Sequence, residues 1–337
     1  MSTVAVFGVV CSALAQQAPD SVSIRVIATF DYPGTGILST RAQKINDTGD
    51  IVGDYFDSNG VYRSFVRFSN GNFSAPIVDP NDTCNFTAGR GINNSRLVCG
   101  DYYYGNCTPA TAHGYFLMRN NFSQFDVPGS VSTVVLGVNN AGDFAGGFVD
   151  AAGTSQAFVS IGETITPFSV PGATLTAAYQ LNSSNQTEGH YIDSSGIFHG
   201  YVRDTNGALH FPIDPSGSIE TELFGNNDSN WIVGRYQDSA GTTHGLFFVP
   251  PNRFFSFDYP GSTFTSFNGI NAQGFICGRY LDASGIEHGI LARVRVSVSA
   301  NDAGTEMKAD YSRSFIAPMS AQLELSKPAA QTVLNNQ

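Results

Sequence analysis

The chain has 337 residues, of which 42% are hydrophobic and only 13% are charged, and its formal net charge is -11. An acidic balance of this size repels a phosphate backbone, and the few arginines are scattered, so the composition argues against nucleic-acid binding. The 36 glycines, 26 phenylalanines and 14 tyrosines favour a turn-rich β fold over a helical one.

The chain begins with an apolar run at residues 4–10, which is followed by Ala-Leu-Ala at 13–15. This order predicts a secretory signal peptide over residues 1–15, although the usual basic start is missing. No other apolar segment reaches the roughly 20 residues that a membrane helix needs. We therefore expect a secreted protein, extracellular or at the cell surface, without a membrane span.

A pattern of about 45 residues then recurs six times. Each unit has a landmark glycine, an Asn seven residues before it and a Thr six residues before that Asn. The glycines are Gly53, Gly100, Gly146, Gly189, Gly234 and Gly278; the Asn column is Asn46, Asn93, Asn139, Asn182, Asn227 and Asn271; the Thr column is Thr40, Thr87, Thr133, Thr176, Thr221 and Thr265. The units cover about 33–78, 79–125, 126–169, 170–213, 214–257 and 258–298.

Turn signals divide each unit into four short apolar runs, which is typical of a β-propeller blade. The stretch IATFDYPG at 27–34 nearly repeats FFSFDYPG at 254–261, which ends a unit, yet it stands before the first unit. We therefore predict an all-β, six-bladed β-propeller with four-stranded blades over residues 22–298. A strand at 24–31 should complete the last blade and so close the ring.

The repeated pattern is Ile-Asn-x-x-Gly-x-(Ile/Val)-x-Gly-x-Tyr, followed by Asp-x-x-Gly and His-Gly, over about residues 27–293. It resembles the extracellular HAF-family repeat, which is named for a His-Ala-Phe motif, with Gly here in place of Ala. The resemblance implies an exported, repeat-built protein. It implies no activity, because the family has no well-defined one.

Histidine occupies one column of the repeat, three residues after the turn glycine, where other units have Arg63 and Gln156. The column contains His113, His199, His244 and His288. A general base or a zinc ligand cannot be replaced by Arg or Gln, whereas a hydrogen-bond donor can. We interpret the His, Thr and Asn columns as structural, and we predict no catalytic residue, metal site or cofactor.

Function is expected where the repeat varies. The position three before the Asn column reads Gln43, Arg90, Leu136, Tyr179, Phe224 and Asn268, and the position five before it reads Arg41, Ala88, Val134, Ala177, Glu222 and Ser266. Such mixed chemistry can line the mouth of a ligand-binding channel, or it can reflect irregular packing between unequal blades. The candidate ligand-binding residues are Arg41, Arg90, Tyr179 and Glu222.

The cysteines allow one disulfide. Cys84 precedes the first strand of the second unit and Cys107 lies in that unit's inserted turn, so two strands place both at the same end of the blade. A disulfide there suits an exported protein. Cys99 and Cys277 hold equivalent positions in blades that are not neighbours, and we expect them to be free and buried.

The leading hypothesis for function is a non-enzymatic binding or assembly module for a carbohydrate, an envelope protein or copies of itself. One alternative is an enzyme acting on extracellular polysaccharide, a hydrolase or a lyase, which needs two carboxylates facing one another. Another is a self-assembling filament or surface-layer subunit joined through residues 300–337. The tail at 299–337, which leaves the repeat, is either disordered or able to add a strand to a partner.

Overall fold

The computed structural model describes residues 21–107 and 111–297. Within these residues all regular secondary structure is β, in 23 strands. The signal peptide predicted at 1–15 and the tail at 299–337 lie outside the described residues.

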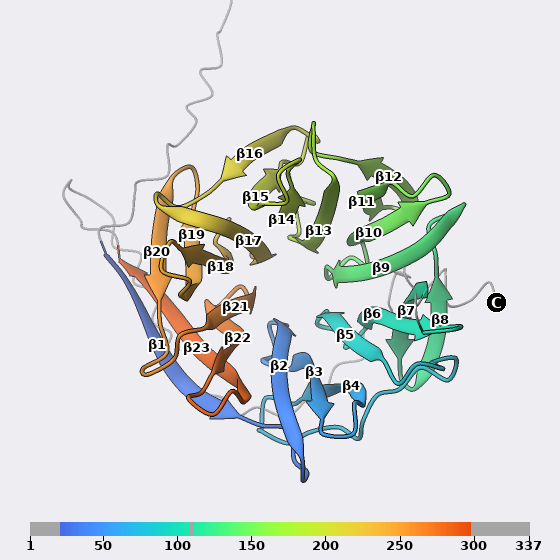
Figure 1. The fold of residues 1–337 in the computed structure, drawn as a ribbon, viewed down its shortest axis with the longest axis horizontal. Coiled ribbons are helices and arrows are strands. Elements are labelled where there is room, and N and C mark those ends of the chain that lie inside the picture. Colours follow the sequence, from blue (N-terminus) through green and yellow to red (C-terminus); the bar gives the residue numbers. More distant parts are fainter. Residues whose placement is uncertain (1–20, 108–110, 298–337) are drawn as a thin grey trace, which may run out of the picture.

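The strands form antiparallel sheets that surround a common centre (Figure 1). Units two to five are each a separate four-stranded sheet whose first strand lies innermost. The second unit contains β5 (Thr87–Ile92), β6 (Val98–Tyr104), β7 (Thr111–Met118) and β8 (Asn121–Phe125), and the third contains β9 (Ser130–Val138), β10 (Phe144–Asp150), β11 (Ser155–Ile161) and β12 (Thr164–Phe168). The fourth contains β13 (Leu175–Leu181), β14 (Thr187–Ile192), β15 (Phe198–Arg203) and β16 (Leu209–Ile213), and the fifth contains β17 (Ser218–Asn226), β18 (Ile232–Asp238), β19 (Thr243–Val249) and β20 (Arg253–Phe257).

The first and last units meet in one seven-stranded sheet. The first contributes β2 (Ile37–Ile45), β3 (Ile51–Asp57) and β4 (Tyr62–Arg67), and the last contributes β21 (Thr265–Ile270), β22 (Phe275–Leu281) and β23 (Glu287–Ser297). The N-terminal strand β1 (Ser21–Phe30) pairs antiparallel with β23, from Ser21 opposite Ser297 to Phe30 opposite Gly289. The N-terminal strand therefore completes the last unit, as the repeat predicts.

The prediction of four strands in every blade is wrong for the first unit. After β4 it has only isolated bridges, between Ser64 and Ile77 and between Arg67 and Phe73. Pro76 stands in this segment, and a proline has no N–H to donate to a strand ladder. Strand pairing also does not close the sheets into a ring, because within the described residues units two to five remain separate sheets. The first and last units are joined by a single parallel bridge between Ser39 and Glu287.

The Asn column links the units instead. In every unit the Asn Oδ1 accepts the backbone N–H groups two and four residues later and so holds the turn. Its Nδ2 donates to the main-chain oxygen of the Asn in the next unit, at 3.0 to 3.4 Å. Asn271 donates in turn to Asn46, which completes a circuit of six bonds that we call the Asn circuit.

We expect Asn93→Asp to lower the free energy of unfolding by about 1–3 kcal/mol. The aspartate keeps the oxygen that holds its own turn, but it places a second oxygen against the carbonyl of Asn139, where Asn93 now donates. Urea unfolding measures the effect, with Asn72→Asp in an exposed turn as the matched control. Equal unfolding midpoints for the two variants would show that the circuit contributes nothing.

The Thr column holds the segment that leads into each innermost strand. In five units the Thr Oγ1 accepts a backbone N–H from six to eight residues earlier, at 2.9 to 3.2 Å. In the fifth unit Thr221 donates to the Ser218 hydroxyl instead. These threonines are all buried, so their hydroxyls satisfy polar groups that water cannot reach.

Every innermost strand has a β-bulge at the position three residues before its Asn. The bulged residue has no partner on the neighbouring strand. Beside the bulge, a Cβ on the landmark glycine would lie only 1.9 to 2.2 Å from a carbonyl oxygen of the innermost strand. No side chain fits there, which explains why glycine recurs in all six units.

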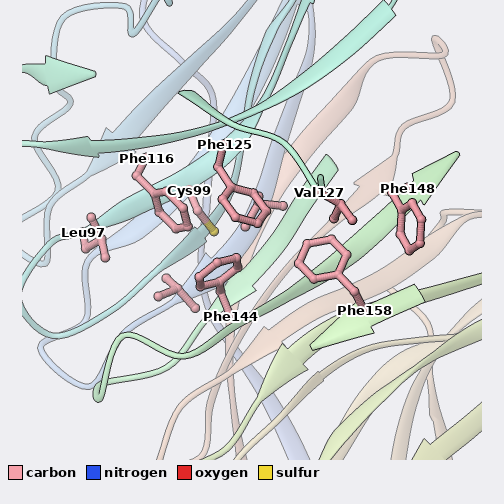
Figure 2. Packing of buried hydrophobic residues seen from close by; sticks show 10 residues of the cluster. Leu97, Cys99, Phe116, Phe125, Val127, Phe144, Phe148 and Phe158 are labelled. Carbon is pink, nitrogen blue, oxygen red and sulfur yellow. The ribbon is translucent and has the colours of Figure 1, made fainter. Parts of the chain in front are cut away.

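The hydrophobic core lies between neighbouring sheets. Figure 2 shows the cluster between the second and third units, where Phe144 packs edge-on against Phe116 and Phe125 with ring centroids 4.9 and 4.8 Å apart. Such contacts between large buried rings are a major part of the folding energy. Aromatic residues are thus used here for packing between units.

The cysteines agree with the sequence prediction. Cys84 and Cys107 form a disulfide, which ties the inserted turn of the second unit to the start of that unit. Cys99 and Cys277 are free and buried. Cys99 lies in the cluster of Figure 2.

Candidate functional site

The bulged residues meet at a cavity in the centre of the molecule. The cavity has a volume of about 190 Å³ and receives side chains from five of the six innermost strands. Its bulged residues are Gln43, Arg90, Tyr179, Phe224 and Asn268. A bulge turns a side chain away from the regular alternation of its strand, and here it directs the variable column toward the centre.

All four candidate residues selected from the sequence line this central cavity. Arg41 lies on β2, Arg90 on β5, Tyr179 on β13 and Glu222 on β17, so they come from four different units. The repeat register alone therefore brings together residues up to 181 positions apart. That they bind a ligand remains a prediction.

Guanidinium groups dominate the cavity, and carboxylates hold them in place. Arg90 Nε donates to Asp101 Oδ1 at 2.7 Å, and Arg235 donates to Glu222 Oε1 through two nitrogens, at 2.7 and 2.5 Å. Such charge-assisted bonds fix the orientation of an arginine more firmly than packing alone. Both guanidinium groups are therefore oriented by carboxylates of the protein itself.

Arg41 and Arg279 share one carboxylate. Arg41 Nε lies 2.5 Å and Arg279 Nε 3.1 Å from the carboxylate of Glu287, which comes from the first residue of β23. Burial lowers the pKa of Arg279 to about 10, so the group is still cationic at neutral pH. Two positive groups therefore face a single negative one.

A further carboxylate, that of Asp54, is buried beside the cavity. It accepts hydrogen bonds from the Tyr62 hydroxyl and, at 2.7 Å, from Gln43 Nε2. Burial raises the pKa of Asp54, while Arg90 and Arg41 oppose that rise. Both carboxylate oxygens of Asp54 therefore have a hydrogen-bond partner within the protein.

Aromatic rings line one side of the cavity. The Tyr179 ring lies 5.0 Å from Phe224 and 5.3 Å from His190, between ring centroids. Burial lowers the pKa of His190, so its ring is neutral although Nδ1 lies 3.4 Å from Glu222 Oε2. The same side therefore combines apolar ring surface with hydrogen-bonding groups.

A second cavity of about 240 Å³ adjoins the first and shares Glu222 and Arg235 with it. It is lined in addition by Phe264, whose ring lies under the guanidinium groups of both Arg235 and Arg279, 5.4 and 5.3 Å from its centroid. The ion pair of Glu222 and Arg235 thus lines both cavities.

The sequence reasoning missed Lys44, Arg235 and Arg279, all of which line the central cavity. A signal for two of them exists in the column directly after the landmark glycine. That column reads Asp54, Asp101, Gly147, His190, Arg235 and Arg279, which is as mixed as the columns that were chosen.

The histidine column lies elsewhere, since none of its members lines either cavity. Each Nδ1 lies 2.7 to 3.0 Å from an Asp carboxylate at the end of an outer strand or just beyond it. Each ring also stacks on the aromatic residue two positions after the landmark glycine. These contacts recur around the molecule without converging, which supports the structural interpretation.

Two features are absent from the part of the chain that the structure describes. Over residues 21–107 and 111–297, no three His, Cys, Asp or Glu side chains are grouped closely enough to hold a metal ion. The same residues form no helix of the length and apolarity that a membrane crossing requires.

No family model matches the chain, and no curated protein matches it in sequence. The resemblance to the HAF repeat is therefore not confirmed by a family match. Among solved structures, the lectin of Aleuria aurantia in complex with Fucα1-6GlcNAc gives a TM-score of 0.50 at 10% identity, covering 81% of this chain and 100% of the lectin.

A second structure of that lectin, described as a fungal lectin with a six-bladed β-propeller fold, gives 0.47 at 10% identity, covering 78% and 98%. A lectin from Burkholderia pseudomallei gives 0.45 at 12% identity, covering 79% and 84%. Identities this low show likeness of fold alone. The chain is an all-β repeat protein with β-propeller architecture.

Proposed function

We propose that this protein is a secreted, six-bladed β-propeller, closed by β1, that binds carbohydrate in its central cavity. The observation that carries the proposal is the convergence of the variable, bulged column on that one cavity. Positions that only support the fold are uniform around the ring, whereas these differ in every unit. Variable side chains at a shared centre are the expected sign of ligand recognition.

The chemistry of the cavity suits a sugar. A sugar ring offers hydroxyl groups that donate and accept hydrogen bonds and a C–H face that packs on aromatic rings. The cavity supplies charged hydrogen-bonding groups such as Arg90 and Glu222 beside the rings of Tyr179 and Phe224. The lectin of Aleuria aurantia, which is similar in fold and whose structure contains Fucα1-6GlcNAc, supports carbohydrate as the ligand class.

The ion pairs favour a binding protein over an enzyme that acts on polysaccharide. Asp101, Glu222 and Glu287 are each bonded to arginine, and Asp54 accepts the Tyr62 hydroxyl. A glycosidase needs one carboxyl group free to give a proton and another free to attack or to activate water. The disulfide between Cys84 and Cys107 and the predicted signal peptide support secretion.

A glycan array with the full chain tests the proposal. We expect binding to a restricted set of glycans, and we expect Tyr179→Leu to weaken that binding at least tenfold, because the variant loses the ring and hydroxyl that face the ligand. Tyr104→Leu is the matched control, since Tyr104 is 52% exposed and lies outside both cavities.

If the protein bound none of the neutral, acidic and sulfated glycans on the array, the carbohydrate proposal would be overturned. Binding that Tyr179→Leu leaves unchanged would place the ligand outside the central cavity.

A further inference from the structure

Positive charge exceeds negative charge around the central cavity. Of the described residues that line it, five are cationic and only Glu222 is acidic; the five are Arg41, Lys44, Arg90, Arg235 and Arg279. Three carboxylates pair with the four arginines, because Arg41 and Arg279 share Glu287. The protein as a whole has a net charge of -11, so the sign of the charge around the cavity is opposite to that of the whole chain.

Lys44 is the cation that the protein leaves unpaired. It stands two residues before its Asn, a column in which four other units have glycine: Gly91, Gly137, Gly225 and Gly269. Glycine is needed there because the strands approach closely; a Cβ on Gly269 would lie 2.9 Å from the Cα of Lys44. Lys44 is thus a long side chain where the repeat usually has none, and it extends into the cavity.

The Lys44 side chain is only 4% exposed, yet it makes no hydrogen bond or ion pair with any of the described residues. Its Nζ lies 5.5 Å from the centroid of the Tyr179 ring. The Tyr179 hydroxyl likewise forms no hydrogen bond within residues 21–107 and 111–297, and Tyr179 lines the same cavity. Burying an ammonium group without a partner lowers the stability of the folded protein. A role in binding would explain why a lysine stands at this position.

The nearest opposing charge does not neutralise Lys44. Glu188 is fully buried, and both of its carboxylate oxygens lack a hydrogen-bond partner. Burial raises the pKa of Glu188 and so favours its neutral form, although the charge of Lys44 opposes that rise. Burial lowers the pKa of Lys44, and no oxygen of Glu188 lies within the 4.0 Å of its Nζ that an ion pair requires.

We propose that the central cavity selects acidic saccharides, and that Lys44 and the Tyr179 hydroxyl bind the carboxylate of a uronic acid. This inference rests on the proposed carbohydrate-binding function and names its ligand class. A carboxylate would give Lys44 its missing partner and would accept a hydrogen bond from Tyr179. Arg90 and Arg279, which line the same cavity, add to the positive potential that attracts it.

The size of the cavity and the charge of the protein narrow the ligand further. A volume of about 190 Å³ is below that of sites for drug-sized molecules, so one sugar ring is expected to enter rather than a longer segment. The acidic exterior repels long polyanions. A terminal uronic acid on an otherwise neutral glycan meets both conditions.

Calorimetry with the full chain tests the inference through matched ligands. We expect D-galacturonate to bind at least tenfold more tightly than both D-galactose and the methyl ester of D-galacturonate, because one charge-assisted contact is worth that much. Lys44→Met removes the charge and keeps the length of the side chain. This variant is expected to bind D-galacturonate no more tightly than its methyl ester.

Arg25→Met is the control for loss of a positive charge, because Arg25 is exposed on the outer strand β1. Circular dichroism of each variant shows that it is folded.

Equal affinity for acid and ester, or an acid preference that survives Lys44→Met, would overturn this inference while carbohydrate binding stands. Tighter binding of galactose 6-sulfate would overturn the assignment to a carboxylate. If neither calorimetry nor the glycan array detected binding of any sugar, the proposed function itself would be overturned.

Discussion

A chain that starts at residue 32, and therefore lacks β1, is expected not to fold, whereas a chain that starts at residue 21 keeps the melting temperature of the full protein. β1 pairs along its length with β23 and adds Val22 and Ile24 to the cluster that contains Val294. Without it the backbone groups of β23 lose their partners and that apolar surface is exposed to water. A typical domain is stabilised by only about 5–15 kcal/mol, so the loss of a whole strand of the last unit is expected to prevent folding.

Circular dichroism and size-exclusion chromatography of the two truncations measure this effect. A synthetic peptide of residues 21–31, added to the shorter chain, should restore folding if β1 acts through strand pairing. A shorter chain with an unchanged melting temperature would show that β1 is dispensable.

Glu188→Val should stabilise the protein, most strongly near pH 8. The column directly before the landmark glycine is apolar in every other unit: Val52, Cys99, Ala145, Val233 and Cys277. Glu188 is fully buried, and neither of its carboxylate oxygens has a hydrogen-bond partner. Its carboxylate also lies more than 4.0 Å from the ammonium group of Lys44, so the two form no ion pair. Valine, of similar volume, should fill the position without a buried polar group.

The direction of the pH dependence follows from the raised pKa of Glu188. The folded state holds the proton up to about pH 8, whereas the unfolded chain releases it near 4.5. The cost of ionising Glu188 in the folded state is thus absent below about pH 4.5 and grows as the pH rises toward 8. Wild-type stability should fall across that window, and the fall should be missing in Glu188→Val.

Urea unfolding at pH 5, 6.5 and 8 measures the difference. Glu163→Gln, at an exposed turn, is the control for loss of an acidic group. Parallel stability profiles for the wild type and Glu188→Val would contradict the assignment.

The repeat could be predicted from the sequence because its fixed columns answer local physical needs. A landmark glycine such as Gly189 is required by a carbonyl that would touch any side chain, and an Asn such as Asn182 is required to hold its turn. The same structural requirements recur in every unit, so the same residues recur about every 45 positions in the sequence. The same period places Arg41, Arg90, Tyr179 and Glu222 on innermost strands and thus near the centre.

The remaining features of the fold and the site depend on contacts that the repeat pattern does not reveal. The fourth strand of the first unit is missing because of its own local sequence around Pro76, which the average unit does not show. Glu287 belongs to the last unit but neutralises Arg41 of the first, a contact that exists only across the junction of the chain ends. The unpaired state of Lys44 likewise could not be foreseen, since it reflects which carboxylates fail to reach it.

The Asn circuit also bears on how the molecule comes apart. In an open array of repeats, each unit contacts only its neighbours, and the ends can fray while the middle stays folded. Here Asn271 donates to Asn46, so no unit is terminal and the loss of any one leaves two others without a partner. Unfolding is therefore expected to be a single cooperative transition, with calorimetric and van't Hoff enthalpies that agree, despite the modular construction of the chain.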